Sequence, residues 1–207
     1  MKEEQDYIRD IAEIRFMMER SSKFLMLSGW AGITAGIYAL SGAYIAYKFF
    51  DFNPDEIVYS SPSESLFSNL LKVIFLAIII LILATGTAIF LSYKKANKRG
   101  EKLWNATAKR LLINMAVPLI VGGFLILILI SKGLIGLIVP FTLLFYGLAL
   151  YNASKFTYDA VKILGLIEIG LGLISAYFIG YGLLFWALGF GLIHIIYGIY
   201  IHYRYER

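Results

Sequence analysis

Long apolar segments separated by short polar stretches dominate the hydrophobic pattern of the chain. These segments, each almost free of charge, cover 24–50, 70–93, 111–130, 134–151, 161–179 and 183–201. About 20 apolar residues, rising ~1.5 Å each in an α-helix, cross a hydrocarbon core of ~30 Å. The segments lack the alternation of barrel strands, and helices satisfy their own backbone polar groups. The pattern therefore predicts an all-α, polytopic bundle of six transmembrane helices.

The first 23 residues form a separate, charged region. Apolar side chains recur there at helical spacing, at Tyr7, Ile11, Ile14 and Met18, with acids and bases on the other face. This spacing predicts an amphipathic helix over 3–23. The helix could pack beneath its own bundle or dock a cytoplasmic partner protein.

The connections between segments also differ in kind. The first one, 51–69, carries acids and no base, whereas 93–111 is basic and contains Gly100, where we expect a helical extension to break. The connections at 131–133 and 180–182 are so short that spans three and four, and spans five and six, must form antiparallel hairpins.

Basic residues predict the orientation of the bundle. All lysines and arginines except Lys48, Lys72 and Lys132 fall on the side that holds both ends of the chain and the connection 93–111. Positive charge is retained in the cytoplasm. We therefore expect both termini in the cytoplasm of a cell whose inner membrane the chain crosses.

Composition narrows the chemistry without identifying a reaction. The 207-residue chain is 59% hydrophobic, has no cysteine and has two histidines, which excludes disulfides and thiolate metal sites. We predict no metal site, no cofactor and no catalytic residues. The basic residues that keep one side of the bundle in the cytoplasm account for the net charge of +5, so we expect no nucleic acid as a partner. The expected partners are membrane lipids, a second copy of the chain or a cytoplasmic protein.

One pair of ionisable residues lies inside the predicted spans. Glu168 lies 13 residues before Tyr181, the centre of the last short turn, and His194 lies 13 residues after it. Both therefore sit ~20 Å from the turn, at one depth. Small residues accompany each of them at helical spacing, so we expect the two small faces to oppose each other and to bring Glu168 to His194.

A buried carboxylate in a span has either a partner or a function. The pair could lock the hairpin through hydrogen bonds, or it could handle a proton or bind a ligand in a pocket open to the cytoplasm. Further polar residues in the same half of the bilayer are candidate pocket residues: Thr87, Asn114, Asn152 and Lys155. Tyr146, well inside the fourth span, needs a hydrogen-bond partner.

Two stretches carry a resemblance to a known family. The first begins with IRFMMERSSKF at 14–24, and the second includes YGLALYNASKFT at 146–157 and GLLFWALGFG at 182–191. With Glu168 and His194, they resemble a family of small six-helix membrane proteins of the kind found in Bacteroidetes. The resemblance implies a bacterial inner membrane protein, and no activity is assigned to that family.

These observations favour a function in binding, transport or sensing of a small amphipathic molecule or lipid near Glu168 and His194. A non-catalytic structural or regulatory protein that docks a cytoplasmic partner is the alternative. An intramembrane enzyme is a second alternative. It ranks below the other two, because the chain has none of the usual catalytic motifs.

Overall fold

The computed structural model describes residues 24–50 and 64–206, and every regular element among them is a helix. The predicted amphipathic helix over 3–23 and most of the acidic connection lie outside the described residues. The all-α prediction is therefore confirmed for the part of the chain that holds the apolar segments.

Six long helical segments make up the described part of the bundle. The first five are α2 (Gly29–Phe49), α4 (Glu64–Lys98), α5 (Ala106–Ser131), α6 (Ile138–Ala153) and α7 (Asp159–Tyr177). The last is one continuous rod of α8 (Gly182–Trp186), η4 (Ala187–Ile193), α9 (His194–Ile201) and η5 (His202–Glu206), in which η4 and η5 are π-helical. Single 3-10 turns precede or follow three of the helices: η1 (Ile135–Leu137), η2 (Ser154–Phe156) and η3 (Ile179–Tyr181).

Five of these segments are long and apolar enough to cross a membrane. They are Asn69–Lys98, Ala106–Ser131, Ile135–Phe156, Asp159–Tyr177 and Ile179–Glu206. The sixth, α2, has 21 residues and is less apolar, because glycines and tyrosines occupy many of its positions. The described residues thus form a helical bundle with five candidate membrane spans.

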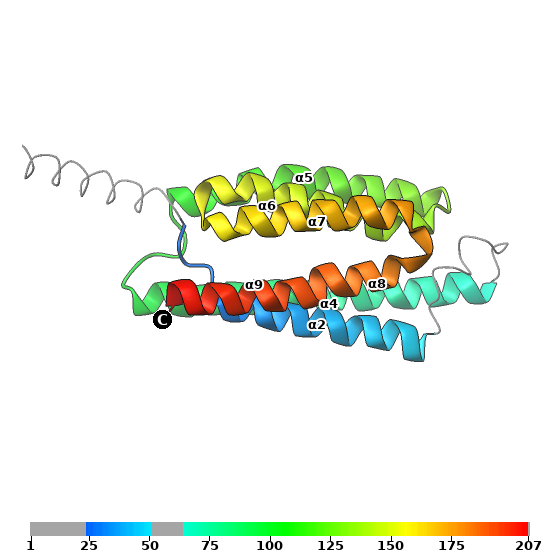
Figure 1. Ribbon diagram of the computed structural model, residues 1–207, viewed down its shortest axis with the longest axis horizontal. Helices are drawn as coiled ribbons and strands as arrows, with labels where there is room; N and C mark the ends of the chain where they lie inside the picture. The colour runs from blue at the N-terminus through cyan, green and yellow to red at the C-terminus, as the bar shows by residue number, and fades with distance from the viewer. Residues whose placement is uncertain (1–23, 51–63, 207) are drawn as a thin grey trace, which may run out of the picture.

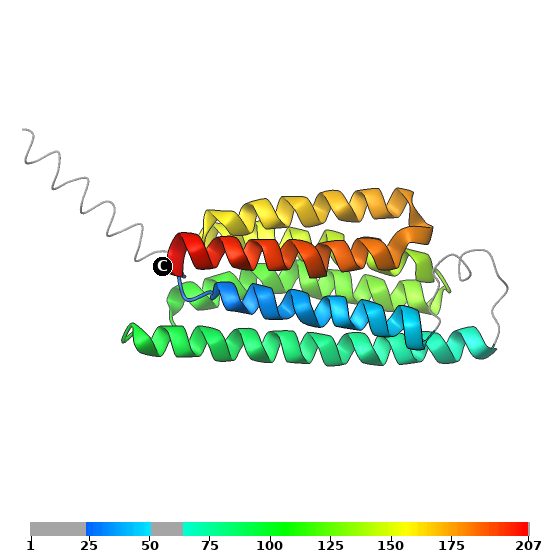
Figure 2. The ribbon, with the colours of Figure 1, turned by 60° about the horizontal axis from the view of Figure 1, so that its bottom comes forward.

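The described helices form two layers (Figure 1). In one layer α6 packs between α5 and α7, and in the other α2 packs between α4 and the last rod. Figure 2 shows this second layer, with α2 lying between α4 and α9. Contacts between the layers are sparser and run mainly from α6 and α7 to α8, η4 and α9. We call this interface the seam.

Glycines explain why the helices within each layer lie so close together. A methyl group placed on Gly165 of α7 would lie 2.8 Å from the carbonyl oxygen of Gly147 on α6, and one on Gly198 of α9 would lie 2.5 Å from that of Gly29 on α2. Only glycine allows such close approach of two backbones. The prediction that the small faces of the last two spans oppose each other is therefore wrong. Each faces a neighbour within its own layer.

Several helix ends differ from the predicted spans. The α2 helix begins at Gly29, after a non-helical segment over 24–28, and the last rod continues to Glu206. The predicted break at Gly100 and the tight turn at 131–133 are confirmed, since Gly100 and Gly133 have φ angles of 66° and 71°. Glycine adopts this left-handed conformation without the steric cost of a side chain.

Candidate functional site

Glu168 is fully buried at the seam, halfway along α7. Its carboxylate lies against η4 of the other layer, because a methyl group on Gly189 would lie 2.6 Å from its Oε2 atom. The side chain is 0% exposed, and neither carboxylate oxygen has a hydrogen-bond partner among the residues that the structure describes. A buried polar group without a hydrogen bond is costly, and a charged one more so.

His194 lies beside this carboxylate, as the count of residues from the turn predicted. Its Nδ1 atom is 3.4 Å from Glu168 Oε1. The same nitrogen is closer to the carbonyl oxygen of Gly189, at 2.8 Å. Because a carbonyl only accepts, Nδ1 must carry a hydrogen and donate it there. The contact with Glu168 is therefore electrostatic and not a hydrogen bond.

The second ring nitrogen of His194 is also occupied. Tyr146 of α6 places its hydroxyl 2.9 Å from Nε2, which supplies the partner that the buried tyrosine needs. In the neutral imidazole Tyr146 donates to Nε2. Both nitrogens of His194 are thus used by other groups, and none is left to satisfy Glu168.

Half-buried aromatic side chains extend this cluster along η4. The Phe190 ring lies 5.1 Å from that of Tyr146 and 5.9 Å from that of His194, and Trp186 lies 5.6 Å from Phe190. η4 is π-helical immediately before His194. π-helical turns are rare in proteins, and those that occur are often found at functional sites.

Ser175 adds a second unsatisfied group to the same face of α7. Its side chain is 0% exposed, and its Oγ atom has no hydrogen-bond partner within residues 24–50 and 64–206. Ser175 lies two turns from Glu168, roughly 10 Å along the helix axis. One face of α7 therefore carries two buried polar groups that hydrogen-bond to no other described residue.

The other predicted pocket residues do not join this pair. Thr87 pairs with the hydroxyl of Tyr38 within its own layer, at 3.4 Å, and the Asn114 amide donates to the Arg110 carbonyl one turn earlier, at 2.8 Å. Lys155 is exposed, and Asn152 lies six residues beyond Tyr146, roughly 9 Å along α6. None of them hydrogen-bonds to Glu168 or His194 in the described part of the chain.

Sequence reasoning missed the role of Gly189. Its carbonyl binds His194, and its missing side chain leaves room for the Glu168 carboxylate. The glycine itself was a signal of close packing at that position. Helical spacing instead placed Gly191 on the same face as His194, but Gly191 faces Leu40 of α2.

The site offers one carboxylate, one imidazole and one phenol. Among residues 24–50 and 64–206, no three His, Cys, Asp or Glu side chains gather in a way that could hold a metal ion. The chemistry available here is attraction of a cation, exchange of a proton and packing of aromatic rings against an apolar group. Comparison of the chain with family models, with curated proteins and with solved structures gives no match in any of the three.

Proposed function

We propose that the chain crosses a bacterial inner membrane six times, with both ends in the cytoplasm. The distribution of lysine and arginine supports this topology. So does the hydrogen bond of 3.1 Å from the Gly29 backbone to Glu206, which joins the start of α2 to the end of the last rod. Single cysteines test it with a membrane-impermeant maleimide: S131C should react in intact cells and N97C only after permeabilisation. The reverse pattern would invert the topology.

Within this membrane protein, the seam is the proposed binding site for a small amphipathic molecule that carries a positive charge, such as a long-chain amine. The protein would transport or sense this molecule. The observation that carries the proposal is Glu168, a fully buried carboxylate at the interface between the two layers, whose two oxygens accept no hydrogen bond from any described residue. A bound ammonium group would supply the missing donors.

The surroundings of Glu168 favour a cation over an anion or a neutral molecule. The carboxylate only accepts hydrogen bonds when ionised, and the neighbouring aromatic rings present faces that attract cations. No described Lys or Arg forms a salt bridge with Glu168. The half-buried rings of Phe190 and Trp186 would contact the apolar part of such a ligand.

Native mass spectrometry with three probes of equal chain length tests this proposal. Dodecylamine, dodecanol and dodecanoate share an apolar tail and differ in charge. The wild-type protein should bind dodecylamine more tightly than dodecanol by at least about tenfold, which corresponds to ~1.4 kcal/mol for the ionic contact. Glu168→Gln should remove this preference because the glutamine amide carries no charge.

Glu101→Gln is the matched control, since Glu101 is exposed in the connection between α4 and α5. It should leave the preference for the amine unchanged. Equal binding of the three probes to the wild-type protein, or an amine preference that survives in Glu168→Gln, would contradict the proposal. Glu168 would then be a neutral, structural side chain within the hairpin.

A further inference from the structure

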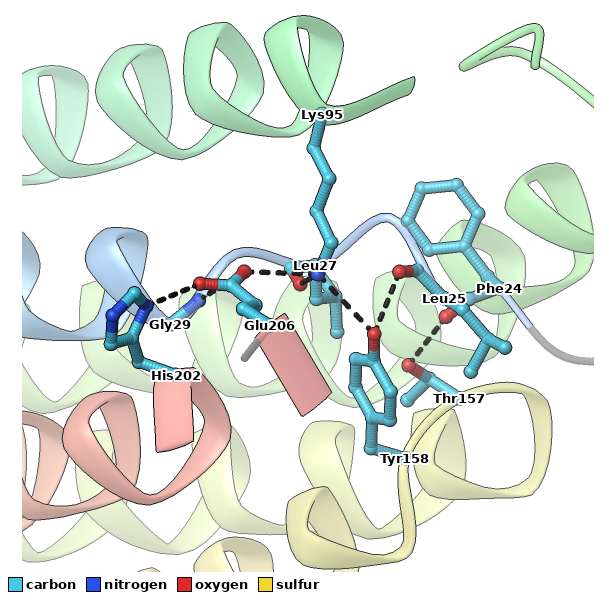
Figure 3. A network of polar contacts seen from close by, with 9 residues as sticks. All are labelled: Phe24, Leu25, Leu27, Gly29, Lys95, Thr157, Tyr158, His202 and Glu206. Carbon is cyan, nitrogen blue, oxygen red and sulfur yellow. Dashed lines mark hydrogen bonds and ion pairs between the residues drawn. The ribbon is translucent and has the colours of Figure 1, made fainter. Parts of the chain in front are cut away.

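The non-helical segment 24–28 is held from both sides at the end of the bundle that contains Glu206 (Figure 3). On one side it pairs with the α6–α7 connection. The Phe24 backbone N–H donates to the Phe156 carbonyl at 2.6 Å, the Thr157 hydroxyl donates to the Phe24 carbonyl at 2.7 Å, and the Tyr158 hydroxyl donates to the Leu25 carbonyl at 2.7 Å.

On the other side the segment is bound by the layer of α4 and the last rod. The Lys95 ammonium donates to the Leu27 carbonyl at 2.6 Å and to Glu206 Oε1 at 2.9 Å. Glu206 also accepts the Gly29 backbone N–H, and its second oxygen lies 2.9 Å from His202 Nδ1. The ion pair is largely buried, so solvent screens it less than an exposed pair.

Lys95 and Tyr158 connect the two layers directly. The Lys95 ammonium lies 3.3 Å from the Tyr158 hydroxyl and 5.6 Å from the centre of its ring. The Tyr158 ring in turn lies 4.3 Å from that of Tyr205 on the last rod. Elsewhere the contacts between the layers are sparse, so these contacts close one end of the seam.

An apolar cluster fills the seam between this network and the Glu168 site. It includes Leu150 of α6, Val161 and Leu164 of α7, and Ile201 of α9, all buried. On each helix, these residues lie between the site residue of that helix and the end of the bundle that contains Glu206. The site residues are Tyr146 on α6, Glu168 on α7 and His194 on α9. Any opening of the seam from that end must therefore separate both the polar network and this apolar cluster.

We infer that Lys95, Tyr158 and Glu206, together with the segment 24–28, form a latch that closes the seam at this end and controls access to the interior. When the latch is intact, Leu150, Val161, Leu164 and Ile201 exclude water from the Glu168 site. When its polar contacts are lost, the layers separate locally at this end while the packing within each layer persists, because the glycine contacts there are unaffected.

A single cysteine at Ile201 reports this opening, since Ile201 is 0% exposed and the natural chain has no cysteine. The measurement is the rate at which N-ethylmaleimide labels I201C protein in liposomes. A buried thiol reacts only through transient opening, so its rate follows the population of the open form.

Two substitutions remove different parts of the latch. Lys95→Met removes the ion pair and the bond to Leu27, and Tyr158→Phe removes the hydroxyl bonds but keeps the ring. Each should raise the labelling rate of I201C by about tenfold, equivalent to ~1.4 kcal/mol in the opening equilibrium. Lys94→Met and Tyr200→Phe are matched controls at exposed neighbouring positions, and both should leave the rate unchanged.

A second reporter separates opening of the seam from unfolding. Ala149 is 0% exposed and lies one turn beyond Phe145, whose side chain contacts Gly122 of α5. A149C therefore sits within one layer, and its labelling should stay slow in both latch variants. Three results would overturn the inference. The labelling rate of I201C in the latch variants could stay within twofold of the rate of I201C alone, it could rise equally in Lys94→Met, or it could rise together with the rate of A149C.

The latch does not depend on the ligand proposed for Glu168, because the labelling rates are measured without any added amine. A failure of amine binding with accelerated labelling in the latch variants would refute only the proposed function. Amine binding through Glu168 with unchanged labelling would refute only the latch.

Discussion

His194 can satisfy two partners, and the structure gives it three neighbours. Its Nδ1–H serves the Gly189 carbonyl and its Nε2 pairs with Tyr146, so Glu168 receives only an electrostatic contact at 3.4 Å. This shortage of donors gives the site its expected affinity for a cation. A carboxylate already bonded to two donors would have little to gain from a ligand.

The Tyr146 hydroxyl should stabilise the protein through this arrangement. Tyr146→Phe leaves Nε2 of His194 without a partner, so we expect the free energy of unfolding to fall by about 1 kcal/mol, the usual order for a hydrogen bond in a membrane protein. Unfolding by SDS in mixed micelles measures this change.

Tyr200→Phe is the reference for that experiment, because it removes the same atom from an exposed position on α9. Its effect should stay within about 0.5 kcal/mol, as for other surface changes. A loss no larger in Tyr146→Phe than in Tyr200→Phe would show that the bond to His194 contributes nothing to stability.

At this scale the sequence predicted the pair but not its surroundings. Equal distances from Tyr181 placed Glu168 and His194 at one depth, since the rise per residue of a helix is fixed. Gly189 and Tyr146 could not be assigned in this way. Their contacts depend on the rotation of each helix and on the π-helical turn over 187–193, and neither follows from spacing.

Within each layer, the packing of the helices depends on glycines that face a neighbouring backbone. Gly165→Ala would place a methyl group 2.8 Å from both the Gly147 carbonyl oxygen and the Tyr151 nitrogen. Backbone atoms cannot move aside easily, so α6 and α7 must separate, and we expect a loss of about 1–3 kcal/mol in the free energy of unfolding.

Gly170→Ala is the matched change on the same helix. A methyl group there meets no atom within 4 Å, so the better helix propensity of alanine should leave stability unchanged or raise it by up to about 1 kcal/mol. Thermal unfolding of the two variants in the same detergent measures the difference. Equal stability of the two would mean that close packing of α6 on α7 does not stabilise the bundle.

The sequence identified the small faces of the last two spans but assigned them the wrong partners. Helix spacing shows which residues share a face, whereas the choice of neighbour depends on which other helix carries matching glycines. Gly147 on α6 and Gly29, Gly32 and Gly36 on α2 provide better partners than the two spans provide for each other. The last two spans are therefore adjacent in the chain without being each other's closest-packed neighbours.

At the scale of the whole molecule, the seam separates two tightly packed layers. Hydropathy predicted the helices and their approximate limits, since apolar length determines which segments can cross a bilayer. It did not predict the non-helical segment 24–28, because Phe24, Leu25 and Leu27 are as apolar as the helix that follows. Side chains distant in sequence, such as Lys95 and Thr157, donate hydrogen bonds to carbonyl groups of that segment, which a helix would have used itself.

The central claim is that an amphipathic cation binds at the seam beside Glu168, and photolabelling locates it most directly. A dodecylamine derivative with a diazirine near its amino group, irradiated with the membrane-embedded protein, marks the residues that surround the ammonium group. Peptide mapping should place the label on α7 and η4 around Glu168, and Glu168→Gln should abolish it while Glu101→Gln does not. Label confined to the exposed faces of α4 and α5, and unchanged in Glu168→Gln, would contradict the account.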